Sequence, residues 1–243
     1  MRAGVIVFPG TNCDRDTKLA CEGFGWETDY VWHSETSLDK YDVILLPGGF
    51  SYGDYIRSGR LAKFSPVIGA VKEYIKKKRG FVIGICNGFQ ILCEAGLLPG
   101  VLTDNWNTRF ICKEVGLRLD SGKQVRSFDP EDDGKSAGGK AKAGSKNIVL
   151  PIAHGEGRYI AENIPEEMIF LTYTDNPNGS AKDIAGLYDR KNRIIGMMPH
   201  PERAFFAETG NTDGREIFKI IQKALEAGSA SATATTGPRG AGQ

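Results

Sequence analysis

Short apolar runs alternate with helical stretches through the N-terminal part of the chain, and this alternation limits the possible folds more than any other feature. Gly4–Phe8 is β-branched and continuously apolar, as expected of a strand that is buried on both faces. The pattern predicts strands and helices in turn, at Gly4–Phe8, Asp14–Gly25, Trp26–Trp32, Val43–Leu46, Arg60–Arg79, Phe81–Ile85 and Asn87–Ala95. This order predicts an α/β fold with a mostly parallel, doubly wound sheet and helices on both faces.

The C-terminal part of the chain continues with predicted strands and ends in one more helix. The strands are expected at Phe110–Leu119, Ile148–Ile152, Ile169–Tyr173, Ile184–Tyr188 and Arg193–Met198, and the helix at Asp213–Ala227. Residues 120–146 contain almost no large apolar side chains and are predicted to form a mobile insertion. Residues 228–243 are predicted to be a disordered, low-complexity tail, which leaves one domain over residues 1–227.

Charge and hydropathy exclude two classes of partner. The 243 residues include 31 basic and 30 acidic side chains, so a net charge of +1 provides no general field for nucleic acid. The longest apolar runs, such as Val43–Leu46, are far shorter than the roughly 20 residues of a membrane-spanning helix. No segment has the form of a signal peptide. We therefore expect a cytoplasmic protein that binds neither nucleic acid nor membrane.

Five cysteines occur in the chain, and none of them forms a Cys-x-x-Cys pair. This pattern argues against a structural zinc site, and an odd number argues against a disulfide framework. A single cysteine is most often a small buried apolar residue, so a catalytic role has to be argued from its neighbours. We predict no metal site.

Cys86 has such neighbours, because it lies where the fourth predicted strand meets the next helix. A nucleophile at this kind of junction is raised on a tight turn, and Gly84 and Gly88, two residues to either side, relieve crowding as in the elbow of serine hydrolases. The N-terminus of a helix favours a thiolate, and the backbone N–H of Asn87 points to where an oxyanion would form. Cys86 is therefore predicted to be a catalytic nucleophile.

A thiol nucleophile needs a base, and the chain has three histidines. His200 has a proline on each side, which favours an extended backbone and places Glu202 on the same side as the imidazole. Glu202 can then hold one ring nitrogen protonated and leave the other free to accept the thiol proton. His154 is the rival, but the glycines around it favour a flexible loop that lines a substrate site. His33 is interpreted as a surface residue.

The loop after the third predicted strand begins with Gly48, Gly49 and Phe50. Paired glycines at this edge of a parallel sheet let the backbone approach a ligand, so the loop is predicted to contribute to an oxyanion site beside Cys86. Nucleotide motifs are not found: Gly134-Lys135-Ser136 resembles the end of a phosphate loop, but it lacks the leading glycine and a preceding strand. We expect no ATP site in this chain.

Taken together, these motifs resemble those of class I glutamine amidotransferases, and most closely the members that serve purine biosynthesis. The resemblance extends over about residues 3–227 and rests on the segments Phe8–Asp14, Pro47–Asp54, Gly84–Gln90, Ile152–Arg158, Asn176–Ser180 and Gly196–Ala204. Residues 120–146 and the tail do not resemble the family. The resemblance implies a flavodoxin-like sheet and a glutaminase reaction.

The resemblance also implies roles for individual residues. Cys86 would attack the carboxamide of glutamine, His200 would act as base and then as acid, and Glu202 would orient the imidazole. The remaining residues would form the oxyanion and glutamine sites: Gly48, Gly49, Phe50, Asn87, Gln90, His154 and Gly155.

Ammonia from this reaction would pass to a separate synthetase subunit that binds ATP and magnesium, with a small third subunit bridging the complex.

Three alternatives stay open. A free-standing cysteine hydrolase, such as a peptidase or deglycase, would share the elbow, although it would usually draw its histidine from another place. A silent binding module would share the fold but would have lost a member of the triad. The chain could also serve a different synthetase.

Overall fold

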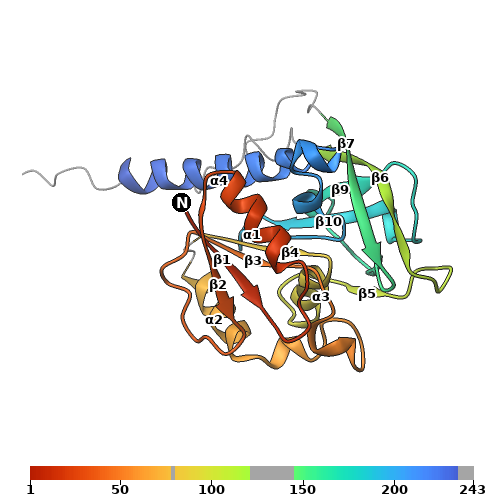
Figure 1. Cartoon of the computed structure of the whole chain (residues 1–243), viewed down its shortest axis with the longest axis horizontal. Coiled ribbons are helices and arrows are strands. Elements are labelled where there is room, and N and C mark those ends of the chain that lie inside the picture. Colours follow the sequence, from red (N-terminus) through yellow and green to blue (C-terminus); the bar gives the residue numbers. More distant parts are fainter. Residues whose placement is uncertain (78–79, 121–144, 235–243) are drawn as a thin grey trace, which may run out of the picture.

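A nine-stranded sheet runs through the part of the chain that the structure describes, residues 1–77, 80–120 and 145–234 of a computed structural model (Figure 1). The sheet order is β2-β1-β3-β4-β11-β10-β9-β6-β7, and β5 and β8 form a separate pair. The strands are β1 Arg2–Val7, β2 Glu27–Trp32, β3 Val43–Leu46, β4 Phe81–Ile85, β5 Val101–Thr103, β6 Ile111–Asp120, β7 Ser145–His154, β8 Arg158–Ile160, β9 Ile169–Tyr173, β10 Ile184–Asp189 and β11 Ile194–Met197. The α-helices are α1 Asp14–Gly23, α2 Pro66–Lys76, α3 Asn87–Glu94 and α4 Arg215–Ala234.

Five strands, from β2 to β11, pair in parallel. Every residue of β3 and β4 is buried, which is what the continuous apolar runs predicted for strands covered on both faces. The carboxyl ends of β3, β4 and β11 therefore open on the same edge of the sheet. This half confirms the predicted α/β class.

The other strands, β10, β9, β6 and β7, extend the sheet in antiparallel pairs. β11 is the junction, because it pairs in parallel with β4 and antiparallel with β10. The sheet is thus mixed rather than parallel throughout. Among the described residues, no α-helix lies between β6 and β11, and the strands of this part pair as antiparallel neighbours.

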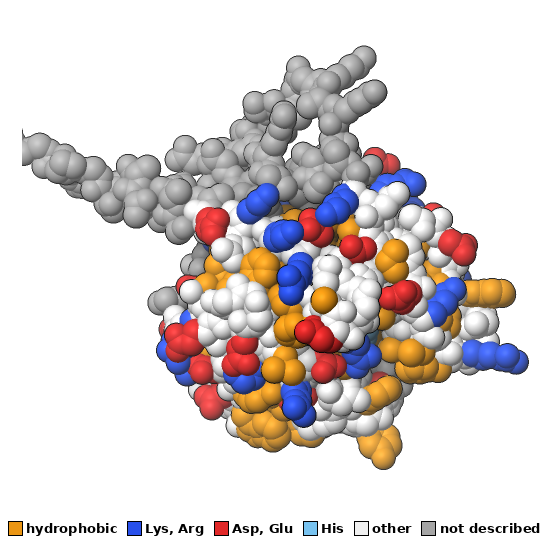
Figure 2. All heavy atoms as spheres, turned by 45° about the horizontal axis from the view of Figure 1, so that its top comes forward, with side chains coloured by type: hydrophobic (Ala, Val, Ile, Leu, Met, Phe, Trp, Pro, Cys, Tyr) orange, Lys and Arg blue, Asp and Glu red, His pale blue; other side chains and the backbone are white. Residues whose placement is uncertain are grey.

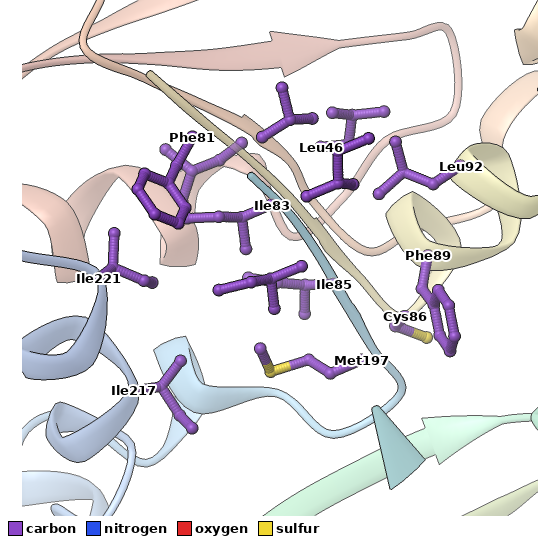
Figure 3. Packing of buried hydrophobic residues seen from close by; sticks show 14 of the residues in the cluster. Leu46, Phe81, Ile83, Ile85, Cys86, Phe89, Leu92, Met197, Ile217 and Ile221 are labelled. Carbon is purple, nitrogen blue, oxygen red and sulfur yellow. The ribbon is translucent and has the colours of Figure 1, made fainter. Parts of the chain in front are cut away.

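Helices cover both faces of the sheet, as predicted: α1 and α4 lie above it in Figure 1, and α2 and α3 below it. On the first face, Ile217 and Ile221 of α4 approach Ile83 and Ile85 of β4 (Figure 3). On the second face, a Cβ at Gly84 would lie 2.6 Å from the side chain of Leu92 in α3. Alternate residues of β4 therefore face different helices, as strand geometry requires.

The helix expected over Arg60–Arg79 is much shorter, and this prediction was wrong at its start. Ala62–Phe64 is a 3₁₀ turn, and α2 begins only at Pro66. Ser65 is extended (φ −64°, ψ 142°) because the ring of a following proline disfavours helical geometry. Phe64, expected on the buried side, is 74% exposed.

Two boundaries in the C-terminal part also differ from the prediction. Asp120, Ser145 and Lys146, assigned to the insertion, are paired residues of β6 and β7, and residues 121–144 lie outside the described residues. α4 continues past Ala227 to Ala234, so the predicted tail starts in a helix. Alanine is the best helix former, and it is frequent in this segment. Residues 235–243 lie outside the described residues.

Charged side chains are mixed on the face shown in Figure 2, where basic and acidic groups alternate without a large patch of one sign. None of the helices in the described ranges is long and apolar enough to span a membrane.

Candidate active site

Cys86 lies between β4 and α3, and its backbone angles (φ 50°, ψ −106°) are ones that residues other than glycine rarely adopt. Its N–H donates a 2.7 Å hydrogen bond to the carbonyl of Met197, at the end of the neighbouring strand β11. Its carbonyl accepts the N–H groups of Phe89 and Gln90 in the first turn of α3. These bonds hold the strained turn in place, and the side chain projects at the carboxyl edge of the sheet.

Gly84 and Gly88 make room for this turn. A Cβ at Gly84 would lie 2.6 Å from the carbonyl carbon of Gly88, and a Cβ at Gly88 would lie 1.9 Å from the carbonyl oxygen of Leu46 in β3. α3 can therefore pack directly on β3 and β4 only because both side chains are missing. The predicted relief of crowding on both sides of Cys86 is confirmed.

His200 follows β11, the strand adjacent to β4, and is paired with Glu202. Their Nδ1 and Oε1 atoms are 2.6 Å apart, and both side chains are almost fully buried. The carboxylate can only accept a hydrogen bond, so Nδ1 carries the proton, while Nε2 is buried and makes no hydrogen bond. The predicted proximity is confirmed, although Pro201–Arg203 is a 3₁₀ turn rather than an extended segment.

The charges around His200 favour its protonated form. Burial alone lowers the pKa of the imidazole, but Glu202, followed by Cys86 and Cys13, outweighs burial and holds the pKa well above its ordinary value. The thiol of Cys86 is 5% exposed, and its Sγ lies 3.7 Å from the carbonyl oxygen of Ala153. The arrangement can thus hold a proton taken from the thiol on an imidazole that a carboxylate stabilises.

The glycine loop lies directly beside this pair. A Cβ at Gly48 would lie 2.7 Å from Cε1 of His200, so only glycine fits there. Gly49 has φ +146° and bridges Thr11, and the N–H of Phe50 donates to the carbonyl of Gly10 at 3.0 Å. The segment before α1 therefore holds the backbone of the predicted oxyanion loop in place. Phe50, at the rim of this loop, is 47% exposed.

Asn87 and Gln90 connect the elbow to two loops. Oδ1 of Asn87 accepts the N–H of Ser51 at 3.2 Å, and its Nδ2 donates to Oε1 of Gln90 at 2.9 Å. Nε2 of Gln90 donates to the carbonyl of Glu156 at 2.6 Å. α3 therefore fixes the glycine loop on one side and the loop after His154 on the other.

His154 is the last residue of β7, 3% exposed, and is held by Asn105. Oδ1 of Asn105 accepts the N–H of Gly157 and lies 3.0 Å from Nδ1 of His154, while its Nδ2 donates to the carbonyls of His154 and Arg109. Because Oδ1 is an acceptor, Nδ1 of His154 carries the proton. Burial, and next the charge of His200, lower the pKa of His154 to about 4. His154 is thus a fixed, neutral residue, and the expected flexible loop is wrong for this position.

One group of potential metal ligands is found among the described residues: Cys13, His200 and Glu202, whose donor atoms lie within 4.8 Å of one another. Two of the three already form the hydrogen-bonded pair. The guanidinium of Arg203 lies 3.0 Å from Sγ of Cys13, and its positive charge opposes a bound cation. The arrangement therefore fits a thiol–imidazole reaction better than metal chemistry.

Comparison with known proteins agrees with this geometry. Residues 1–224 match the model of the CobB/CobQ-like glutamine amidotransferase domain. A protein of Prochlorococcus marinus (strain NATL2A) named phosphoribosylformylglycinamidine synthase subunit PurQ is 45% identical over 230 residues, covering 91% of this chain and 99% of its own. The PurQ of Ruegeria pomeroyi is 44% identical over 232 residues, with 93% and 99% covered. The chain belongs to the PurQ family of glutamine amidotransferases.

Solved structures support the same membership. The chain is similar to one in the structure of PurLQS from Thermotoga maritima, with a TM-score of 0.80, 40% identity and 92% and 98% of the two chains covered. A putative GMP synthase subunit of Thermoplasma acidophilum, at a TM-score of 0.62 and 16% identity, shares the fold. The PurQ family fold thus includes both the parallel half of the sheet and its antiparallel extension.

The structure connects several residues predicted for this PurQ-family site: Gly48 lies beside His200, and Asn87 and Gln90 join the glycine loop to the segment after His154. Gly155 follows His154, and its carbonyl accepts the N–H of Asn105 at 2.9 Å. Their catalytic roles remain predictions. His33 is only partly buried and lies 3.0 Å from the hydroxyl of Tyr52, outside the group. Two residues were missed, Asn105 and Cys13. No local pattern marks Asn105, whereas Cys13 lies in the Phe8–Asp14 segment that carried the resemblance without receiving a role.

Proposed function

We propose that this chain hydrolyses glutamine at Cys86 and supplies the ammonia to a synthetase subunit that converts formylglycinamide ribonucleotide to formylglycinamidine ribonucleotide in purine biosynthesis. The observation that carries the proposal is the elbow cysteine beside a buried His200–Glu202 pair in a chain of the PurQ family. The name of the relatives specifies the synthase, and the Thermotoga maritima structure is that of PurLQS.

The chemistry follows from the positions of the groups. Cys86, having lost its proton to Nε2 of His200, attacks the carboxamide carbon of glutamine, and the resulting oxyanion is held by backbone N–H groups of Gly49 and Asn87. The imidazolium then returns the proton to the departing nitrogen, so that the C–N bond breaks, ammonia leaves and a thioester remains. His200 next takes a proton from water, whose oxygen attacks the thioester carbon; the C–S bond breaks, glutamate is released, and the imidazolium returns the proton to the sulfur of Cys86.

The remaining predicted residues belong to the glutamine pocket, and the cofactors and partners belong to the assembled synthase. We propose that Gly48, Phe50, Gln90, His154 and Gly155 contribute to the glutamine pocket. We propose that the chain itself needs no cofactor, that ATP and magnesium bind to the synthetase, and that a small third subunit joins the two. The assembly would operate in the cytoplasm.

Replacing the nucleophile tests the proposal. In the assembled synthase, Cys86→Ala should abolish glutamine-dependent synthesis, whereas synthesis from added ammonia should continue because the synthetase is intact. A diazoketone analogue of glutamine should label Cys86 alone, and excess glutamine should prevent labelling. Cys93→Ala, which removes another buried thiol from the same helix, serves as control. Loss of both activities in Cys86→Ala would show that Cys86 is structural and would refute the mechanism.

A further inference from the structure

Cys13 is a second buried thiol beside the active-site histidine, and the mechanism above does not use it. It is the N-cap residue of α1 and 2% exposed. Its Sγ lies within 4.8 Å of a nitrogen of His200 and of a carboxylate oxygen of Glu202. A Cβ at Gly48 would lie 3.0 Å from this sulfur and 2.7 Å from Cε1 of His200. The sulfur and the ring therefore share one small space under the glycine loop.

Arg203 also contacts the sulfur of Cys13. Its Nη2 donates to Sγ of Cys13 at 3.0 Å, and its Nε lies 3.4 Å from a carboxylate oxygen of Asp16 in the first turn of α1. Arg203 directly follows Glu202 in the turn Pro201–Arg203, so the same turn carries the carboxylate and the cation. The bond to Cys13 thus ties this turn to the N-terminus of α1.

The backbone of Cys13 ties it to the oxyanion loop as well. Its N–H donates to the carbonyl of Gly48 at 3.2 Å, and its carbonyl accepts both the N–H and the hydroxyl of Thr17 at 3.0 and 2.8 Å. The backbone N–H and the backbone carbonyl of Cys13 are therefore both held by hydrogen bonds. The residue connects three parts of the site: the histidine, the turn with Glu202 and the glycine loop.

We propose that Cys13 is a positioning residue, which together with Arg203 fixes the orientation of the His200–Glu202 pair relative to Cys86. This inference rests on the proposed glutaminase function. Among the described residues, Oε2 of Glu202 makes no hydrogen bond and the imidazole of His200 is bonded only through Nδ1, so few direct contacts hold the two side chains. Packing against the Cys13 sulfur supplies the missing constraint.

Steady-state kinetics of the assembled synthase provide the first test. Cys13→Ala should lower kcat for glutamine hydrolysis about tenfold to a hundredfold with little change in KM, since misplaced catalytic groups reduce the rate rather than substrate binding. Cys13→Ser, whose hydroxyl also accepts a bond from Arg203, should restore most of kcat. Arg203→Met should reproduce the defect, and the double variant should be no slower than either single variant. Ammonia-dependent synthesis should not change.

A spectroscopic signature separates positioning from general stability. The proton between Nδ1 of His200 and Glu202 should give a far-downfield proton resonance, which should shift or broaden in Cys13→Ala and Arg203→Met. It should stay in place in Cys93→Ala, which removes a thiol of similar burial. An unchanged kcat and resonance in both Cys13→Ala and Arg203→Met would overturn the inference while leaving the glutaminase function standing. Retained glutamine-dependent activity in Cys86→Ala would instead refute the function itself.

Discussion

Glu202 stabilises the charged form of His200, and the consequences should be visible in the pH dependence of the reaction. Burial disfavours the imidazolium, and the adjacent carboxylate reverses that effect, so that the pKa of His200 is raised. Glu202→Gln removes the negative charge and keeps the shape of the side chain. The pKa of His200 should then fall, and the alkaline limb of the kcat/KM profile for glutamine should move to lower pH. The profile measured with the assembled synthase checks this.

A matched control distinguishes this local effect from a change in total charge. Glu208 lies in an exposed 3₁₀ turn shortly after the site, so Glu208→Gln makes the same chemical change away from the imidazole. Its pH profile should match that of the unmodified chain. Equal shifts in the two variants would contradict the role assigned to Glu202.

His154 should make the folded chain less stable in acid. Burial, followed by the charge of His200, lowers the pKa of His154 to about 4 from 6.5, so the unfolded chain binds a proton in this range that the folded chain does not. The stabilisation is present above pH 6.5 and is lost as the pH falls toward 4. His154→Gln removes this dependence. The difference in unfolding free energy between the two proteins should change by about 3 kcal/mol over this range, as urea titrations would measure. A constant difference would contradict a buried neutral histidine.

The sequence predicted residues whose signal is local and missed those whose partners are distant. Cys86 is recognised by the glycines beside it, and Glu202 by its spacing from His200. Asn105 contacts His154 across 49 positions, and Cys13 contacts Arg203 across 190. No pattern in a single sequence reports such pairs, because the fold alone brings them together.

At the scale of elements, the contact between α3 and the sheet depends on Gly88. A methyl group there would lie 1.9 Å from the carbonyl oxygen of Leu46, so α3 would have to move. Gly88→Ala should therefore lower the unfolding free energy by about 2 kcal/mol or more, despite the higher helix propensity of alanine. Gly69→Ala is the control, because Gly69 is an exposed residue of α2 with open space around its Cα. That variant should gain about 0.5–1 kcal/mol. Urea unfolding of both variants compares them directly, and an equal gain would contradict the packing argument.

The elements were predicted correctly where burial determines the structure. They were missed where a local conformational preference or the order of the connections determines it. β3 and β4 were recognised from continuous apolar runs. The start of α2 was missed because apolar spacing continues upstream of Pro66, although the proline prevents a helix there. The antiparallel half could not be assigned from periodicity, since strand direction depends on the connections and not on the pattern.

Across the whole molecule, the β6–β7 hairpin separates the attachment points of residues 121–144 from the active site. Ile111 pairs with His154 at the active-site end, and Asp120 pairs with Ser145 at the other end. Ten residues at about 3.4 Å each place these ends about 30 Å apart. Residues 121–144 are therefore attached far from Cys86.

This separation predicts that the segment is dispensable for glutamine hydrolysis. Because Asp120 and Ser145 are direct partners, a two-residue Asn-Gly turn can replace residues 121–144 without changing the register. The shortened chain should be labelled at Cys86 by the diazoketone analogue at the rate of the full chain. Slower labelling would show that the segment reaches the active site.

The backbone of Cys86 also restricts which nucleophiles evolution or design can place at this elbow. At φ 50° a β-branched side chain clashes with its own backbone, so threonine is excluded although its hydroxyl could serve chemically. Serine, which is unbranched at Cβ, fits the turn. The geometry of one turn therefore favours nucleophiles that are unbranched at Cβ, such as cysteine and serine, over threonine.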